Sequence, residues 1–169
     1  MLKIETWDKN KILRTISKEI KQSEFKEYTK LWKEMVKYIK NPKHMGVWLA
    51  APQVGHNKRL IVVSLMKHWD DENFPTIMML NPTITEFSEN SEIDVEGCLS
   101  VPGGKGKVRR PVSITMKYID EKGKEKKLHL DGLPARIVQH EVDHLNGVLF
   151  TDRMNETLLD GQEEENYAN

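Results

Sequence analysis

Apolar side chains recur at every third or fourth position over residues 23–40, with lysines and glutamates between them. This spacing predicts an amphipathic helix, which Asn41-Pro42 is expected to end. The stripe contains aromatic residues, and such a stripe is typical of a helix packed on a core rather than of a ligand site. Its apolar members are Phe25, Tyr28, Leu31, Trp32, Met35, Val36 and Ile39.

A second segment with helical spacing covers residues 133–146, and Gly147 fits its C-terminal stop. Its apolar residues lie on several sides of the predicted helix, so we expect the helix to be largely buried. These residues are Leu133, Ile137, Val138, Val142 and Leu145.

The middle of the chain has the pattern of β-strands. Residues 60–63 form a short β-branched run that predicts a buried strand, and residues 76–80 predict another, closed by Asn81-Pro82. Residues 112–119 alternate, and a turn at 120–124 with a return over 126–130 predicts a hairpin. One face of that alternating strand carries Val112, Ile114, Met116 and Tyr118. Between strands, residues 97–107 are too rich in glycine for a regular helix.

A helix, then strands, then a helix predicts an α+β fold. The 169 residues suit one compact domain, and the chain has neither an internal repeat nor an interdomain linker. We therefore predict a single domain over residues 1–169, in which residues 155–169 form a frayed acidic tail.

The charge of the chain balances, with 26 basic and 26 acidic residues, but residues 1–43 hold 11 Lys and 1 Arg against 6 acidic residues. A solvated lysine-rich helix explains this bias, and a surface that faces RNA is the alternative. No motif for sequence-specific nucleic-acid binding accompanies the lysines. No apolar run is long enough for a membrane helix, and no secretory signal is visible. These features favour the cytoplasm, and an organellar location after removal of a transit peptide stays open.

Candidate chemistry is concentrated in the sequence QHEVDHLNG, residues 139–147. His140 and His144 lie four residues apart, so both imidazoles can reach one metal ion from one face of a helix. Glu141 is placed to take a proton from a water on that ion. A polar helix face can produce the same pattern by chance, although the surrounding apolar residues argue for burial and hence for partners.

A catalytic metal needs a third protein ligand. No His or Cys follows Gly147, which leaves acidic residues such as Asp152, while the one cysteine of the chain, Cys98, is the stronger candidate. Cys98 lies in EGCLSVPG, residues 96–103, whose glycines would let the backbone approach a ligand closely. A third stretch, GVWLAAPQVG at residues 46–55, predicts a tight loop in which Gln53 offers an amide donor. Taken alone, this loop would be only a turn.

Together the three stretches resemble the signature motifs of the peptide deformylases, and the similarity covers most of residues 10–153. The resemblance implies small antiparallel sheets packed around a central C-terminal metal-binding helix, with the amphipathic helix near the N-terminus. It implies that Cys98, His140 and His144 bind the metal. The ion is commonly iron(II) in that family, with zinc, nickel or cobalt as substitutes. Gln139 and Asp143 are candidates to support the ligating imidazoles, and Asp143 could equally be a salt-bridge residue.

The resemblance also implies the reaction, which is hydrolysis of the formyl group from the N-terminal methionine of newly made polypeptides. Glu141 would activate a metal-bound water, and the side chain of Gln53 with the backbone N–H of Leu99 would stabilise the oxyanion. Leu133 and Ile137 are candidates for a methionine pocket, although both could be core residues. The full set of predicted substrate-binding residues is Gly46, Val47, Trp48, Gly97, Leu133 and Ile137.

Two features depart from the family pattern. Trp48 stands where a glycine is usual, and its indole would either narrow the cleft or lie in solvent as a lid. The C-terminal tail is acidic, so any transient ribosome contact would need another surface, such as the N-terminal lysines. The alternatives to a deformylase are a degenerate relative that binds without turnover and a metalloprotease.

Overall fold

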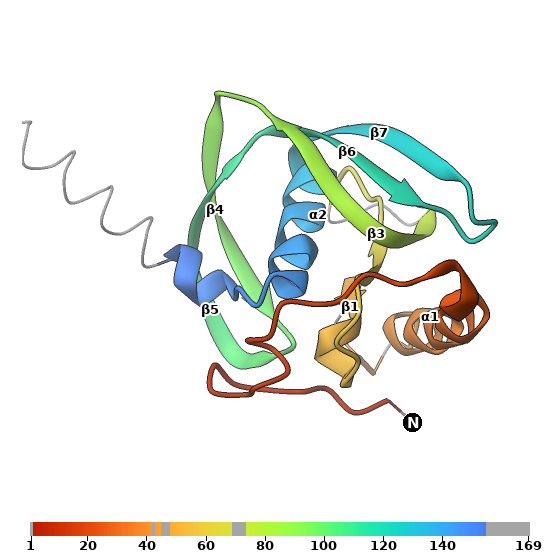
Figure 1. Cartoon of the computed structure of the whole chain (residues 1–169). Coiled ribbons are helices and arrows are strands. Elements are labelled where there is room, and N and C mark those ends of the chain that lie inside the picture. Colours follow the sequence, from red (N-terminus) through yellow and green to blue (C-terminus); the bar gives the residue numbers. More distant parts are fainter. Residues whose placement is uncertain (1, 42, 45–47, 69–73, 155–169) are drawn as a thin grey trace, which may run out of the picture.

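The computed structural model describes residues 2–41, 43–44, 48–68 and 74–154 (Figure 1). The predicted acidic tail, residues 155–169, therefore lies outside the described residues. The helices are η1 (Gln22–Glu24), α1 (Phe25–Ile39), η2 (Ala51–Val54) and α2 (Gly132–Leu145). The strands are β1 (Trp48–Ala50), β2 (Leu60–Ser64), β3 (Thr76–Phe87), β4 (Ser91–Cys98), β5 (Val101–Pro111), β6 (Ser113–Ile119) and β7 (Glu125–Asp131).

The strands form two antiparallel sheets. Five strands pair in the order β1-β2-β3-β6-β7, and β4 pairs with β5 in a separate two-stranded sheet. In Figure 1 helix α2 runs through the centre, with β4 and β5 on one side and the larger sheet on the other. This arrangement confirms the predicted α+β fold, in which small antiparallel sheets surround a central C-terminal helix.

The larger sheet is covered by a helix on each face. Successive side chains of a strand point to opposite faces, and β2 is buried at every position. Ile61 and Val63 pack in the cluster that contains α2, while Leu60 and Val62 pack in the cluster that contains α1. The apolar side chains of β2 therefore pack into two hydrophobic cores, one on each face of the sheet, as is expected for a strand buried on both faces.

Helix α1 confirms the prediction for residues 23–40. Its buried residues fall at helical spacing and pack on the sheet, so the aromatic stripe is core packing; they are Tyr28, Leu31, Met35 and Ile39. The helix ends one residue before Lys40, its C-cap, and the predicted stop at Pro42 lies outside the described residues.

The predicted end of a strand at Asn81-Pro82 is wrong, because β3 continues to Phe87. Asn81 has a positive φ of 49°, and the register with β6 shifts between Leu80 and Thr83. The side-chain amide of Asn81 bonds the backbone N–H and C=O of Ile20, which fixes this irregular residue. Asn81 and Pro82, which usually end a strand, are therefore accommodated within β3 by a β-bulge.

The glycine-rich segment is also more regular than its composition suggests, since most of it belongs to β4 and β5. Gly106 of β5 lies against Met154, and a Cβ on Gly106 would clash with that side chain. Glycine here allows close approach between the hairpin and the segment after α2. The hairpin predicted from β6 and β7 is confirmed, with Ile114, Met116 and Tyr118 buried.

The end of α2 is closed by Gly147, as predicted. Its φ of 73° is left-handed, and the N–H groups of Gly147 and Val148 donate to the carbonyls of His144 and Asp143. This is a Schellman motif. A Cβ on Gly147 would also lie 2.6 Å from the carbonyl oxygen of Arg14, so the N-terminal segment packs directly on this turn.

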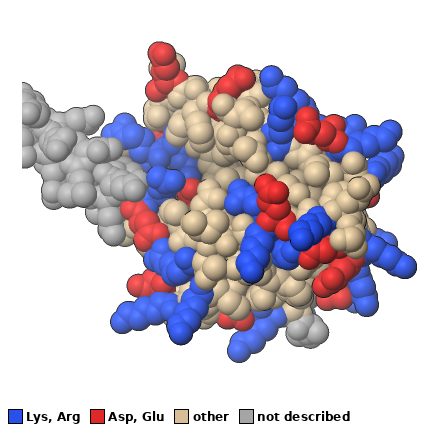
Figure 2. Space-filling model, in the orientation of Figure 1, with Lys and Arg blue, Asp and Glu red and all other residues tan. Residues whose placement is uncertain are grey.

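Charges of both signs are interspersed on the face drawn in Figure 2. This pattern agrees with the balanced composition of the whole chain. No helix of the described part is long and apolar enough to cross a membrane.

Candidate metal centre and its pocket

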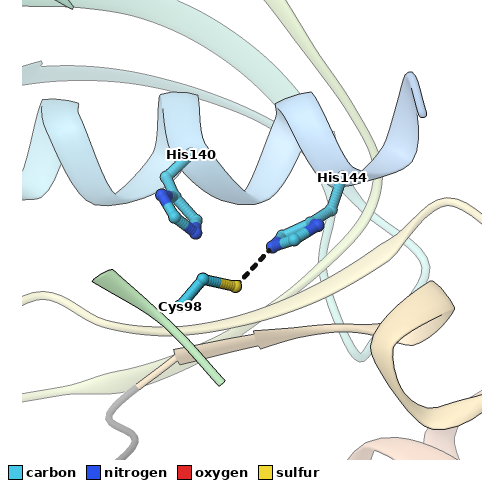
Figure 3. Close-up of side chains that lie close together, drawn as sticks. All are labelled: Cys98, His140 and His144. Atoms are coloured by element: carbon cyan, nitrogen blue, oxygen red, sulfur yellow. Dashed lines mark hydrogen bonds between the residues drawn. The ribbon is translucent and has the colours of Figure 1, made fainter. Parts of the chain in front are cut away.

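Helix α2 brings His140 and His144 to one side, and the end of β4 brings Cys98 against them (Figure 3). Both histidines are almost fully buried. The Cys98 Sγ lies 3.2 Å from the His144 Nε2, and one ligand atom from each of the three residues lies within 4.8 Å of the others. The three residues predicted as metal ligands are therefore brought together.

The donor set fits a metal ion. Cys and His donors that share one ion at about 2.0–2.3 Å lie about 3–4.5 Å from one another. The His140 Nε2 is buried and has no hydrogen-bond partner among the described residues. A buried imidazole nitrogen without a partner costs free energy, and a bound metal would satisfy it.

Cys98 is in an environment that favours its ligating form. Burial raises the pKa of the thiol, but the coulombic attraction of His144 and the contacts with both histidines lower it further, to well below its usual range. The thiolate is the form of cysteine that binds metals.

Glu141 follows the first histidine and is completely buried. Neither carboxylate oxygen has a hydrogen-bond partner among the described residues. Burial raises the pKa of this carboxyl to about 7 against the lowering effect of the two histidines. A carboxyl in this state can accept or release a proton near neutral pH.

Glu96 contacts the ring nitrogen of His140 that does not face Cys98. Its Oε2 lies 2.9 Å from the His140 Nδ1, so the other ring nitrogen is left to face Cys98. Arg110 holds the same carboxylate through two bonds of 2.6 and 3.0 Å, and Arg136 adds a third of 2.8 Å. Burial raises the pKa of Glu96, but the bonds from His140 and Arg110 outweigh this effect and keep the carboxyl ionised. Such a carboxylate fixes the orientation of a ligating imidazole.

Gln53 lies on the short helix η2, where its side chain is locked. The backbone N–H of Ala50 donates to the Gln53 Oε1 at 2.8 Å, which turns the amide nitrogen toward the metal centre. That Nε2 lies 3.4 Å from the Cys98 Sγ and 3.2 Å from the Ser100 Oγ. The loop that looked like an ordinary turn therefore presents an amide donor beside the three ligands.

A pocket of about 670 Å³ opens beside this centre. It is lined by six of the predicted catalytic and substrate-binding residues together with Cys98 and His140; the six are Trp48, Gln53, Gly97, Leu99, Leu133 and Ile137. The predicted residues Gly46 and Val47 lie outside the described residues. Ile137 is also fully buried in the core cluster, as the core interpretation predicts, and its contact with a methionine side chain stays a prediction.

Trp48 is half-buried rather than extended into solvent. It pairs with Val63 in the sheet, packs against the core cluster of α2 and lines the pocket. The indole is thus a wall of the pocket, and the alternative of a lid in solvent does not hold.

Two acidic residues near the centre have structural partners instead. Asp152 pairs with Arg14 and is not part of the converging group of Cys98, His140 and His144. Asp143 is held by Arg110 at 2.8 Å and Arg153 at 3.0 Å, which favours the salt-bridge interpretation of this residue. Gln139 donates to the carbonyl oxygens of Pro111 and Ala135.

Three residues beside the centre were not predicted from the sequence to take part in it: Glu96, Ser100 and Arg110. Glu96 and Ser100 flank the Cys98 motif, so their place in the motif was a signal. Nothing in the sequence indicates a role for Arg110, because Arg110 comes opposite Glu92 and near Glu96 only through the register of β4 with β5.

The fold and the centre together define a class of α+β proteins in which one helix with an HExxH sequence and one cysteine form a metal site. A family model described as polypeptide deformylase matches residues 1–159. The chain belongs to this family.

Relatives and solved structures agree with this assignment. Over 115 residues the chain is 48% identical to a peptide deformylase of Thermosynechococcus vestitus, a match that covers 68% of this chain and 60% of that protein. Over 149 residues it is 44% identical to one of Synechocystis, covering 88% of this chain and 77% of that protein. The chain thus spans only about 60% of the length of several curated relatives.

Among solved structures, a probable peptide deformylase of Synechococcus phage S-SSM7 superimposes with a TM-score of 0.80 at 44% identity, covering 90% of this chain and 99% of that one. The peptide deformylase of Thermotoga maritima gives a TM-score of 0.77 at 35% identity, covering 91% and 97%.

Proposed function

We propose that this chain is a metal-dependent hydrolase that removes the formyl group from the N-terminal methionine of newly made polypeptides and releases formate. The observation that carries the proposal is the buried Glu141 carboxylate, which has no hydrogen-bond partner among the described residues and lies beside three converging candidate metal donors. Family membership and the adjoining pocket support it.

Cys98, His140 and His144 would hold the metal, for which we propose iron(II), with zinc, nickel or cobalt as substitutes. One thiolate and two imidazoles suit several first-row metals. When bound, a divalent ion supplies Lewis-acid chemistry, which acidifies water and polarises a carbonyl oxygen. Glu96 and its arginines keep His140 in the ligating orientation.

Glu141 would act as the general base and then as the general acid. Its carboxylate takes the proton of the attacking water and later delivers it to the leaving amine. Hydrolysis of the formyl amide then yields formate and a free amino group. The pKa of about 7 places this carboxyl where both transfers are accessible at neutral pH.

The oxyanion that develops on the formyl oxygen would be stabilised by Gln53 and by the backbone N–H of Leu99. The amide of Gln53 is preorganised, because Ala50 and Ser100 hold its two ends. A donor fixed before the reaction costs no reorganisation in the transition state.

The methionine side chain would enter the pocket between α2 and β4. Leu133 and Ile137 would supply apolar walls there, and Trp48 would narrow the opening, since all three line the pocket. Gly97 would admit the substrate backbone, and Gly46 and Val47 are proposed to contact the substrate as well. A peptide deformylase of Acinetobacter baumannii, 34% identical to this chain, has been solved with Met-Ala-Ser bound.

The lysine-rich side of α1 is the surface that we propose for transient contact with the ribosome. Lys26, Lys30 and Lys33 share one face of the helix and line a shallow cavity together with Lys122. The cytoplasm, where formylated chains are made, stays the predicted location.

The test is formate release from formyl-Met-Ala-Ser by protein purified without oxygen, with its metal content measured and acetyl-Met-Ala-Ser as the control. We expect release from the formyl peptide alone. No release by folded, metal-loaded protein would favour the degenerate binder. Cleavage of internal bonds in casein would favour the metalloprotease.

A further inference from the structure

One side of the pocket's rim is positively charged. Lys105 and Lys107 are alternate residues of β5, so their side chains share a face of the hairpin. In the register of the two strands, Lys105 lies opposite Gly97 and Lys107 lies opposite Val95. Val95, Gly97 and Lys105 all line the pocket.

The stem of Lys105 lies across Gly97. Its Cγ is 3.7 Å from the position that a Cβ on Gly97 would take, and the lysine itself is exposed. The ammonium group is therefore carried on the open surface beside the pocket. Lys107, also exposed, extends the same row by two residues.

No carboxylate of β4 faces these two lysines. The acidic residues Glu92, Asp94 and Glu96 alternate to the opposite face of the hairpin, where Arg110 and Arg136 hold Glu96. Within the described part of the chain, neither Lys105 nor Lys107 makes an ion pair or a side-chain hydrogen bond. Among the described residues, this side of the rim therefore carries two positive charges without a paired carboxylate, beside the part of a substrate that would extend out of the pocket.

We propose that Lys105 and Lys107 are specificity-determining residues that favour formylated peptides with acidic side chains at two alternate positions after the methionine. The inference rests on the proposed function of the pocket. Alternate residues of a strand are about 6.6–6.8 Å apart, and an extended peptide repeats its side chains at the same distance. Two carboxylates of such a peptide can thus meet the two ammonium groups in register.

The preference is modest in size and sensitive to salt. One exposed ion pair changes an affinity by about two- to fivefold, so two pairs give about tenfold at low ionic strength. Exposed charges are screened over about 8 Å at physiological salt, so the preference shrinks as salt is added.

The experiment compares kcat/KM for three peptides that differ only in charge: formyl-Met-Ala-Glu-Ala-Glu-Ala, its glutamine counterpart and its lysine counterpart. Formate release is measured at low and high salt with metal-loaded protein. The variant is Lys105→Glu with Lys107→Glu. The matched control is Lys37→Glu with Lys40→Glu, an equal charge reversal on the exposed side of α1, across the larger sheet from α2.

We expect the natural protein and the control to rank the peptides glutamate, glutamine, lysine, and the rim variant to reverse that order. Expressing each rate relative to the glutamine peptide removes general losses of activity in a variant. Equal rates on all three peptides, or an unchanged order in the rim variant, would overturn this inference while leaving the proposed function intact. Failure to release formate even from the glutamine peptide would instead refute the proposed function.

Discussion

The buried polar side chains on the two sides of helix α2 differ in their hydrogen-bond partners. On the side of the metal centre, four buried atoms of His140, Glu141 and His144 have no hydrogen-bond partner among the described residues. On the other side, Gln139 and Asp143 are also buried, but Gln139 donates to a backbone carbonyl oxygen and Asp143 accepts from two arginines. An unsatisfied buried polar group costs about 1–3 kcal/mol. The difference therefore matches the roles that we propose, with chemistry on the first side and stability on the other.

This division lies within one six-residue sequence, QHEVDH, at residues 139–144. Because the helix turns by about 100° per residue, neighbours in the sequence reach different surroundings. Substitutions on the two sides should consequently fail in different ways, with activity lost on one side and stability on the other.

The largest effect is expected for Glu141→Ala on the metal side. General acid–base catalysis by a positioned group contributes about 10²–10⁴-fold, so kcat for formate release should fall by that order. Metal content, measured on the purified protein, should remain that of the natural chain, because Glu141 is not one of the three proposed ligands. Because the Glu141 carboxylate has no hydrogen-bond partner among the described residues, its removal should lower the free energy of unfolding only by the cost of the small cavity that it leaves. Activity within tenfold of the natural protein would contradict the role of Glu141.

Cys98→Ser should act on the same side through the metal itself. In this variant a neutral hydroxyl replaces a thiolate. Substitution of a residue that only supports a metal ligand already lowers metal affinity by about 10–100-fold. We therefore expect Cys98→Ser to lower metal affinity by about 100-fold or more. Metal content after dialysis against a chelator measures this loss, and circular dichroism of the dialysed protein checks the fold. Retention equal to that of the natural chain would remove Cys98 from the centre.

Asp143→Asn tests the other side. Its carboxylate is nearly buried between Arg110 and Arg153, and breaking a buried ion pair costs about 3 kcal/mol. The free energy of unfolding in urea should fall by that amount, while kcat per bound metal changes less than tenfold. Asp152→Asn is the matched control, because its pair with Arg14 is more exposed and should be worth less than about 1 kcal/mol. If Asp143→Asn lost as much activity as Glu141→Ala, the proposed difference in role between the two sides of α2 would be wrong.

The sequence could predict most of the metal side, because helical spacing alone sets His140 and His144 on one face. Helices α1 and α2, the strand at residues 60–63 and the hairpin of β6 and β7 could also be predicted, because the periodicity of their apolar residues indicates them. The third ligand was less certain, because pairing Cys98 with the histidines depends on contact between residues far apart in the chain.

The sequence could not predict the partners on the other side. Arg110 reaches Asp143 and Glu96 only through the register of β5, in a hairpin whose glycines and charges obscure the strand pattern. The continuation of β3 past Asn81-Pro82 was missed for a similar reason, because a bulge is stabilised by distant contacts with Ile20. Tertiary contacts thus override local rules where two segments must meet.

The smallest effect is expected for Gln139→Leu, which keeps the volume of the side chain and removes its amide. Gln139 ties α2 to the end of β5 through the carbonyl oxygen of Pro111 at 3.0 Å. Losing that bond should lower the free energy of unfolding by about 1 kcal/mol, while the exposed Gln22→Leu should change nothing measurable. Gln139 faces away from the metal donors, so the loss of its bond to Pro111 should leave the contacts with the transition state unchanged. We therefore expect kcat/KM to stay within about twofold of that of the natural protein. A large drop in kcat/KM with unchanged stability would place Gln139 on the chemical side of the helix, and the boundary between the two sides would then have to move.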